Sequence, residues 1–112
     1  MNDKRIFSML GLAMKAGKVT SGEFMVETSV KASQSKLVVV AEDASNNTKK
    51  NFSDMCTYYH VPLVFFGSKT ALGAAIGKEF RASLSVNDEG FAAALKTRID
   101  SERSDGGSEK DE

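Results

Sequence analysis

The feature that most constrains the fold is an uninterrupted apolar run, Leu37-Val-Val-Val-Ala41. β-Branched side chains favour extended backbone, and a run without polar alternation is typical of a strand that is buried on both faces. A second run of this kind, Leu63-Val-Phe-Phe66, follows Pro62. Such strands need a covering layer on each side of their sheet, so the chain is expected to supply helices for both layers.

Helical patterns lie between the predicted strands. Ile6, Met9, Leu10 and Ala13 have the i, i+3, i+4, i+7 spacing that places them on one helix face, and Thr20-Ser-Gly-Glu23 fits a capping box that opens a helix. The predicted strands are a short one near 19, then 37–41, 63–66 and 82–86, and the predicted helices are 6–14, 21–33, one after 45, 69–77 and one after 88. This order predicts an α/β fold, a three-layer α/β/α sandwich with a central mixed sheet of about four strands.

The charge of the chain is distributed unevenly, although the net charge is zero. Residues 1–99 carry 13 Lys and Arg against 9 Asp and Glu, and residues 100–112 carry 2 against 6 without an apolar side chain to bury. We therefore predict a mildly basic domain over 1–99 and a disordered acidic tail over 100–112. The basic surplus alone is weak evidence for a polyanionic partner.

Composition excludes several other classes. The single cysteine, Cys56, cannot form an internal disulfide, and with one histidine, His60, the chain lacks the ligands of a Cys/His zinc site. The apolar runs are far shorter than the roughly 20 residues that span a bilayer. No glycine-rich nucleotide fingerprint occurs in the sequence. We expect a cytoplasmic monomer without a metal or another cofactor.

An enzyme remains an alternative, because open α/β sheets place ligands beyond the carboxyl ends of their strands. Glu42 and Asp43 leave one predicted strand there, and Ser68 with Lys69 leaves another, as in a phosphate-handling site. The simpler interpretation is that Asp43 or Ser45 caps the third helix and Ser68 the fourth. Likewise, we expect His60 in a solvated turn and Cys56 as an inert buried thiol.

The second predicted helix offers an anion site. Lys18, Thr20, Ser21 and Gly22 precede its first backbone amides, which point out of the helix end. Gly22 lets a ligand approach the backbone without a side chain in the way. Phosphate fits this constellation, although most such helix ends are only capped.

The order of these segments resembles the ribosomal L7Ae/L30e family of RNA-binding proteins over about residues 4–99. The resemblance is carried by Ser21-Gly-Glu-Phe, Lys36-Leu-Val-Val-Val-Ala-Glu-Asp-Ala, Cys56 with Val61-Pro-Leu-Val, and Ser68-Lys-Thr-Ala-Leu-Gly-Ala-Ala-Ile-Gly77. Within the family the chain is similar to the small bacterial YlxQ-type proteins through Asp43 to Lys50, Tyr58-Tyr59 and Ile76-Gly-Lys-Glu79.

The resemblance implies an α/β/α sandwich that binds kink-turn RNA, a duplex bent sharply at a bulge beside tandem G·A pairs. The family uses four places: the start of the second helix, the loop after the Ala-Glu-Asp strand, the Ser-Lys helix start and the loop before the last strand. Phosphates would be held by amides and cations, and Phe80 would cover an unstacked base. The candidate RNA-binding residues are Lys18, Gly22, Glu23, Phe24, Thr28, Ser45, Lys49, Lys69, Lys78, Phe80 and Arg81.

One departure from the family affects specificity. Typical kink-turn binders carry Gly-x-Asn-Glu-x-x-Lys, and the same spacing from Gly22 gives Phe24, Met25 and Thr28 here. Glu23 stands one position early. We expect Met25 to pack in the core, while Phe24 is as suited to a ligand as to packing. Recognition then relies on backbone and shape, or the RNA differs.

These observations together predict a non-enzymatic, ribosome-associated protein that binds kink-turn or kink-turn-like structured RNA. The alternatives are a protein-interaction adaptor on the same fold and, less favoured, a phosphate-handling enzyme that uses Glu42, Asp43 and Lys69.

Overall fold

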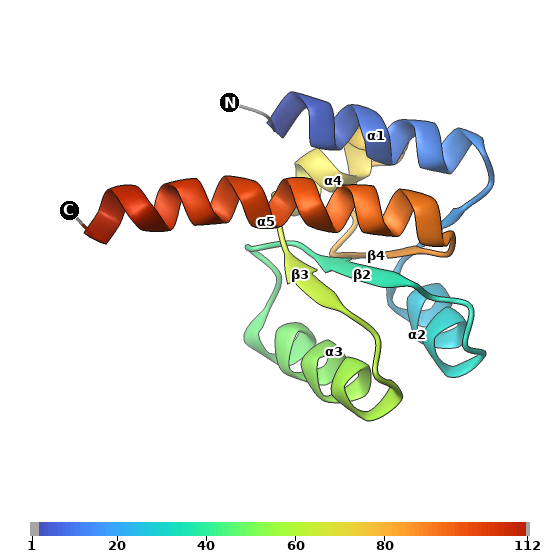
Figure 1. The fold of residues 1–112 in the computed structure, drawn as a ribbon. Coiled ribbons are helices and arrows are strands. Elements are labelled where there is room, and N and C mark those ends of the chain that lie inside the picture. Colours follow the sequence, from blue (N-terminus) through green and yellow to red (C-terminus); the bar gives the residue numbers. More distant parts are fainter. Residues whose placement is uncertain (1–2, 112) are drawn as a thin grey trace.

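A mixed sheet with the strand order β1-β4-β2-β3 forms the centre of the molecule (Figure 1). The computed structural model describes residues 3–111, and the side chains of residues 4–102. β2 pairs in parallel with β3, with Val39 opposite Val64, and β4 runs antiparallel to both β1 and β2. The strands in the described residues are β1 (Val19–Ser21), β2 (Leu37–Val40), β3 (Leu63–Phe65) and β4 (Ser83–Val86).

Helices cover both faces of this sheet. Figure 1 shows α1, α4 and α5 on one face and α2 and α3 on the other. The helices are α1 (Asp3–Lys15), α2 (Glu23–Lys31), α3 (Asn46–Tyr59), α4 (Lys69–Ala75) and α5 (Glu89–Asp111). The predicted three-layer sandwich with a mixed sheet is therefore confirmed.

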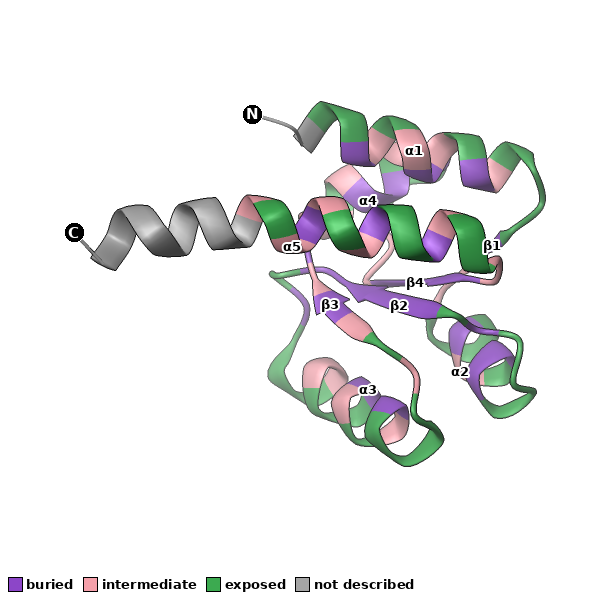
Figure 2. Ribbon diagram, in the orientation of Figure 1, coloured by how far each residue is buried: buried purple, intermediate pink, exposed green. Residues whose placement is uncertain are grey.

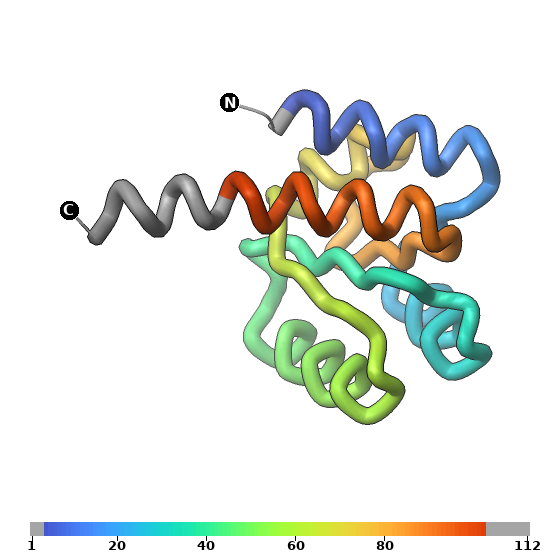
Figure 3. The backbone as a smooth tube through the Cα atoms, in the orientation of Figure 1, coloured from blue at the N-terminus to red at the C-terminus, as the bar shows by residue number. Residues whose placement is uncertain are grey.

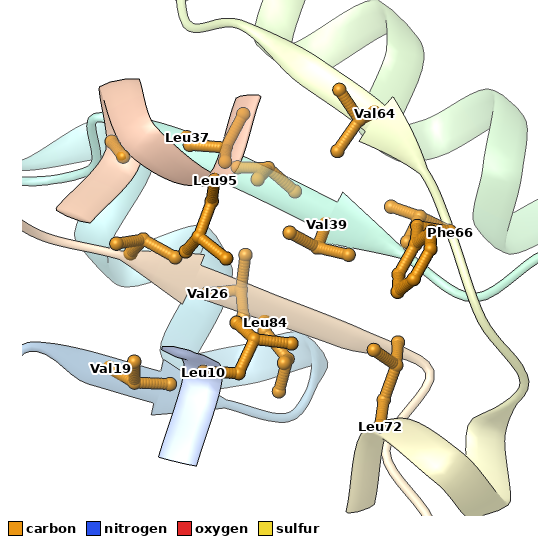
Figure 4. Packing of buried hydrophobic residues seen from close by; sticks show 14 of the residues in the cluster. Leu10, Val19, Val26, Leu37, Val39, Val64, Phe66, Leu72, Leu84 and Leu95 are labelled. Atoms are coloured by element: carbon orange, nitrogen blue, oxygen red, sulfur yellow. The ribbon is translucent and has the colours of Figure 1, made fainter. Parts of the chain in front are cut away.

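The core lies on both sides of β2 and β4. Every residue of β2 is fully buried, as the run of apolar residues predicts, and Figure 2 shows buried positions along both central strands. Leu10, Leu84 and Leu95 pack together on the face that α1 and α5 cover (Figure 4). Each such side chain stabilises the fold by about 1.5–3 kcal/mol relative to exposure.

Helix α2 begins differently from the capping-box prediction, which is wrong. Thr20 and Ser21 pair with Ser85 and Leu84 of β4, so their backbones belong to the sheet. Gly22 becomes the N-cap, and no side chain caps this helix. The Thr20 hydroxyl lies 3.1 Å from the Ser29 hydroxyl instead of reaching the helix start.

Three other helix starts in the described part of the chain have caps, each formed by a side-chain oxygen that accepts from an amide three residues ahead. Ser45 accepts from Thr48 at 3.1 Å and Ser68 from Ala71 at 3.0 Å, as predicted. The carboxylate of Asp88 accepts from the Phe91 amide at 2.9 Å in the same way. These local contacts fix where α3, α4 and α5 begin.

Helix α5 runs across the predicted boundary between the domain and the tail. Helix α5 continues past the fully buried Ile99, and the Lys96 ammonium donates to the Asp100 carboxylate at 2.6 Å. Side chains from residue 103 onward lie outside the described part of the chain, so the disordered tail stays a prediction. Among the described residues, no helix combines the length and apolar character that crossing a membrane needs.

Candidate nucleic-acid interface

One edge of the sheet gathers four segments that lie far apart in the sequence. β1, β2 and β3 all end at this edge and β4 begins there, because β4 runs antiparallel to its neighbours. The Gly22 amide donates to the Ser83 carbonyl at 3.1 Å, and the Glu42 amide donates to the Gly67 carbonyl at 2.7 Å. The start of α2, the loop after β2, the start of α4 and the loop before β4 therefore meet.

Hydrogen bonds connect these four segments in a continuous chain. The Lys69 amide donates to the Asp43 carboxylate at 2.9 Å, and the Arg81 amide donates to the Lys69 carbonyl at 3.1 Å. The Arg81 guanidinium then donates through Nε to the Ser21 hydroxyl at 3.0 Å. The backbone at Lys69 and the side chain at Arg81 are thus held in place before any ligand binds.

The uncapped start of α2 lies within this arrangement. Gly22 has φ 90° and ψ 150°, a conformation essentially restricted to glycine. A Cβ added to Gly22 would meet no atom within 4 Å, so the space beside it is open. Helix starts present unpaired amides and a positive dipole end, which together favour an anion.

Exposed apolar side chains flank this helix start. Phe24 is 76% exposed and Phe80, in the loop before β4, is 62% exposed. Met25 is 47% exposed, so the expectation that it packs in the core is wrong. The buried face of α2 consists of Val26, Ser29 and Val30, and Met25 lies off that face.

Gly73 positions the loop that carries Phe80 and Arg81. A Cβ on Gly73 would collide with the carbonyl of Glu79, so only a glycine lets this loop lie directly on α4. The Lys78 amide donates to the Gly73 carbonyl at 2.8 Å and fixes the start of the loop. The sequence signal for this close approach is the set of small residues Ala71, Gly73, Ala74 and Ala75.

The remaining candidates on this edge vary in how they are held. The Lys49 ammonium lies 5.9 Å from the centre of the Phe65 ring, over its face, while Lys78 and Glu23 are exposed. The Thr28 hydroxyl donates to the Phe24 carbonyl at 2.9 Å, within the helix. Ser45 has its hydroxyl in the α3 cap. Arg81 is thus the candidate cation that a hydrogen bond holds beside the α2 start, and the hydroxyls of Thr28 and Ser45 are already hydrogen-bonded.

Lys18 does not join this cluster. It precedes β1 at the opposite end of the strand, where its carbonyl accepts from the Asn87 amide at 2.7 Å. Val19 pairs with Val86, the last residue of β4, so β1 begins at the edge of the sheet where β4 ends. Lys18 and Gly22 are therefore close in sequence but lie at opposite ends of β1.

Asp43 joins two segments of this edge, a role that the sequence pattern does not predict. Its carboxylate bridges from the loop after β2 to the start of α4, a contact between residues 26 positions apart. The sequence predicts that Asp43 and Lys69 lie near each other, because two strands end at the same edge, but it does not predict the hydrogen bond between them. Among the described residues, no three His, Cys, Asp or Glu side chains lie close enough to hold a metal ion.

The other chemically active residues lie away from this edge. Cys56 is buried in α3, and burial raises the pKa of its thiol to about 11, which leaves it protonated and unreactive near neutral pH. His60 is exposed and ends α3 in the left-handed conformation, with φ 60°. Both placements agree with the expectations from sequence.

Known proteins of similar sequence and structure cover most of this chain. The RNA-binding protein YlxQ of Bacillus subtilis (strain 168) is 44% identical over 100 residues, which span 89% of this chain and all of that protein. The large ribosomal subunit protein eL8 of Picrophilus torridus is 35% identical over 79% of this chain and 70% of its own length. A solved structure of a protein of unknown function from Bacillus halodurans superimposes with a TM-score of 0.82 at 39% identity, over 85% of this chain and 96% of that one.

The sequence profile of one family matches residues 4–96. The chain accordingly belongs to the ribosomal protein L7Ae/L30e/S12e/Gadd45 family.

Proposed function

We propose that this protein binds structured RNA, with a kink-turn or kink-turn-like duplex as the ligand, at the edge where the four segments meet. The observation that carries the proposal is the uncapped start of α2, which lies beside a chain of hydrogen bonds that fixes Lys69 and Arg81. The RNA-binding names of its YlxQ relatives support the same class of ligand.

The chemistry of the edge suits a bent RNA backbone. The amides at the α2 start donate to a phosphate without a competing side chain, and Lys69, Arg81, Lys49 and Lys78 add positive charge around it. Phe80, which projects from the loop before β4, stacks on a base that the kink has exposed. Phe24 offers a second exposed ring beside the phosphate.

Specificity at this edge comes mainly from shape. Phe24, Met25 and Thr28 replace the polar side chains that would read G·A pairs, and the Thr28 hydroxyl already donates within α2. A rigid, preorganised edge selects an RNA whose phosphates and splayed base match it. Lys18, at the other end of β1, contributes only long-range attraction in this proposal.

We propose that the protein binds RNA without catalysing a reaction and that one copy of the chain is sufficient. We also propose that it acts in the cytoplasm in association with the ribosome. A single copy supplies all four segments. The phosphate-handling alternative gains no support from the geometry, since the carboxylate of Asp43 accepts the Lys69 amide at 2.9 Å and so serves to join two segments.

The test of this proposal is the salt dependence of binding to a kink-turn RNA. Lys69→Ala removes a cation while keeping the backbone amide that donates to Asp43, and Arg81→Ala removes a cation together with the hydrogen bond to Ser21. Each variant should bind more weakly, and the slope of log K against log salt should fall by about 0.7–0.9 for each phosphate that is no longer neutralised.

Lys36→Ala is the matched control, because Lys36 is exposed at the opposite edge, next to the pairing of Leu37 with Val86. Its slope should equal that of the unmodified protein. Unchanged slopes for both Lys69→Ala and Arg81→Ala would move the RNA site away from this edge. Thermal unfolding of each variant verifies that the fold is kept.

A further inference from the structure

The helix layer that faces away from α2 and α3 carries an apolar groove that the RNA edge does not use. Helices α1 and α5 lie side by side and run in opposite directions (Figure 3). Met9 and Leu12 from α1, with Phe91 and Ala94 from α5, line a hollow of about 420 Å³. Leu12 is 60% exposed, and together with the other apolar side chains of this hollow it forms a contiguous exposed apolar patch.

The groove continues along α5 beyond this hollow. Met9 and Leu12 also border a second hollow at the start of α1, and Ala94 borders a third that reaches Ser101. From Gly90 to Ser101 the groove follows α5 for about 16 Å at 1.5 Å per residue, or about three helical turns. This length fits a docked helix of about eleven residues.

One end of the groove is cationic. Lys4, Arg5 and Arg98 border it, whereas the carboxylate at the other end, Asp88, already accepts the Phe91 amide. The ion pairs in the described part of the chain join α2, α3 and α5 residues to partners on their own helices, and none of them involves these three cations. The groove therefore combines an apolar floor with a positive end.

We propose that this groove docks an amphipathic helix of another protein, whose apolar side chains fill the floor and whose carboxylates lie over Lys4, Arg5 and Arg98. RNA fits poorly in the central hollow, because its apolar side chains offer no hydrogen bond to a phosphate or base and its one carboxylate, Asp88, repels phosphate. A second copy of this chain, turned about a two-fold axis, would set these three cations against the other end of the groove, where the lining carboxylate of Asp88 already accepts the Phe91 amide. The chain's own acidic segment, 100–112, has no apolar side chain to place on the floor.

The test is photo-crosslinking in living cells that express the full chain with p-benzoylphenylalanine in place of Leu12. Light should attach the probe to a protein segment with apolar residues at helical spacing and acidic residues at one end. Arg98→Glu, in the same crosslinking chain, should lower the adduct yield by about fivefold or more, because like charges then face each other where an ion pair stood.

Lys50→Glu is the matched charge reversal, on α3 across the sheet, and should leave the yield unchanged. Adducts with RNA, with lipid or with a second copy of the chain would overturn the proposal by identifying a different occupant. A yield that Arg98→Glu leaves unchanged, or the absence of any protein adduct, would overturn it as well.

Discussion

Gly22 is the residue on which the proposed phosphate contact depends most directly. Its φ of 90° and ψ of 150° strain any other residue, so Gly22→Ala should lower the free energy of unfolding by about 1–3 kcal/mol. Gly22→Asp has the same backbone strain and adds a negative charge beside the bound phosphate. RNA affinity should therefore fall at least about tenfold further in Gly22→Asp than in Gly22→Ala.

The comparison of these two variants separates charge from strain. Both are measured by thermal unfolding and by titration with the same RNA. Equal affinities for Gly22→Ala and Gly22→Asp would mean that no phosphate lies at the α2 start, whatever their stabilities.

Some features of single residues could be predicted from the sequence, and others could not. The caps at Ser45 and Ser68 and the burial of Cys56 were predictable, because each depends on neighbours within one or two helical turns. Met25 was not, since helical spacing leaves open which side of a short helix faces the sheet. Lys18 was misjudged because its location depends on the pairing of β1 with the distant β4.

At the scale of elements, the close packing between α4 and the loop before β4 controls where Arg81 lies. Gly73→Ala places a methyl group against the Glu79 carbonyl, so the loop must shift. We expect the free energy of unfolding to fall by about 1–3 kcal/mol and RNA affinity to fall with it. Thermal unfolding and RNA titration measure the two effects.

Gly90→Ala is the control for this variant, because the added methyl group meets only the side chain of Asp88, at 3.3 Å. The Asp88 carboxylate, which caps α5, need shift only by a few tenths of an ångström, so this change should alter stability by less than about 1 kcal/mol and keep RNA affinity. If Gly73→Ala behaved like Gly90→Ala, the loop would not depend on α4 for its position.

The elements themselves were largely predictable, and the exceptions have a common cause. The valine run of β2 is buried on both faces because its neighbours β4 and β3 and both helix layers enclose it. The start of α2 was misplaced because strand pairing takes Thr20 and Ser21 into the sheet, a tertiary contact that overrides the local capping pattern. The network from Asp43 to Ser21 joins residues far apart in the chain and leaves no local signal.

At the scale of the whole molecule, the domain and the predicted tail carry net charges of opposite sign. Residues 103–112 carry four acidic and two basic side chains. Ending the chain at Glu102 keeps Ile99 and the pair of Lys96 with Asp100, so the thermal midpoint should not change. RNA affinity should rise at low salt and match that of the full chain at high salt, since salt screens the competing carboxylates. A lower midpoint would show that the tail is packed.

In the proposed function, the edge formed by the four segments recognises a bent RNA mainly by shape. The most direct measurement is the affinity of the unmodified protein for a kink-turn, for the same RNA with Watson-Crick pairs replacing its G·A pairs, and for a plain duplex of equal length. We predict that the kink-turn binds most tightly, the replaced RNA less tightly and the duplex most weakly. Three equal affinities would contradict kink-turn recognition, and a thousandfold rejection of the replaced RNA would contradict recognition by shape, because unpaired polar groups at about 1–3 kcal/mol each would then be reading the G·A pairs.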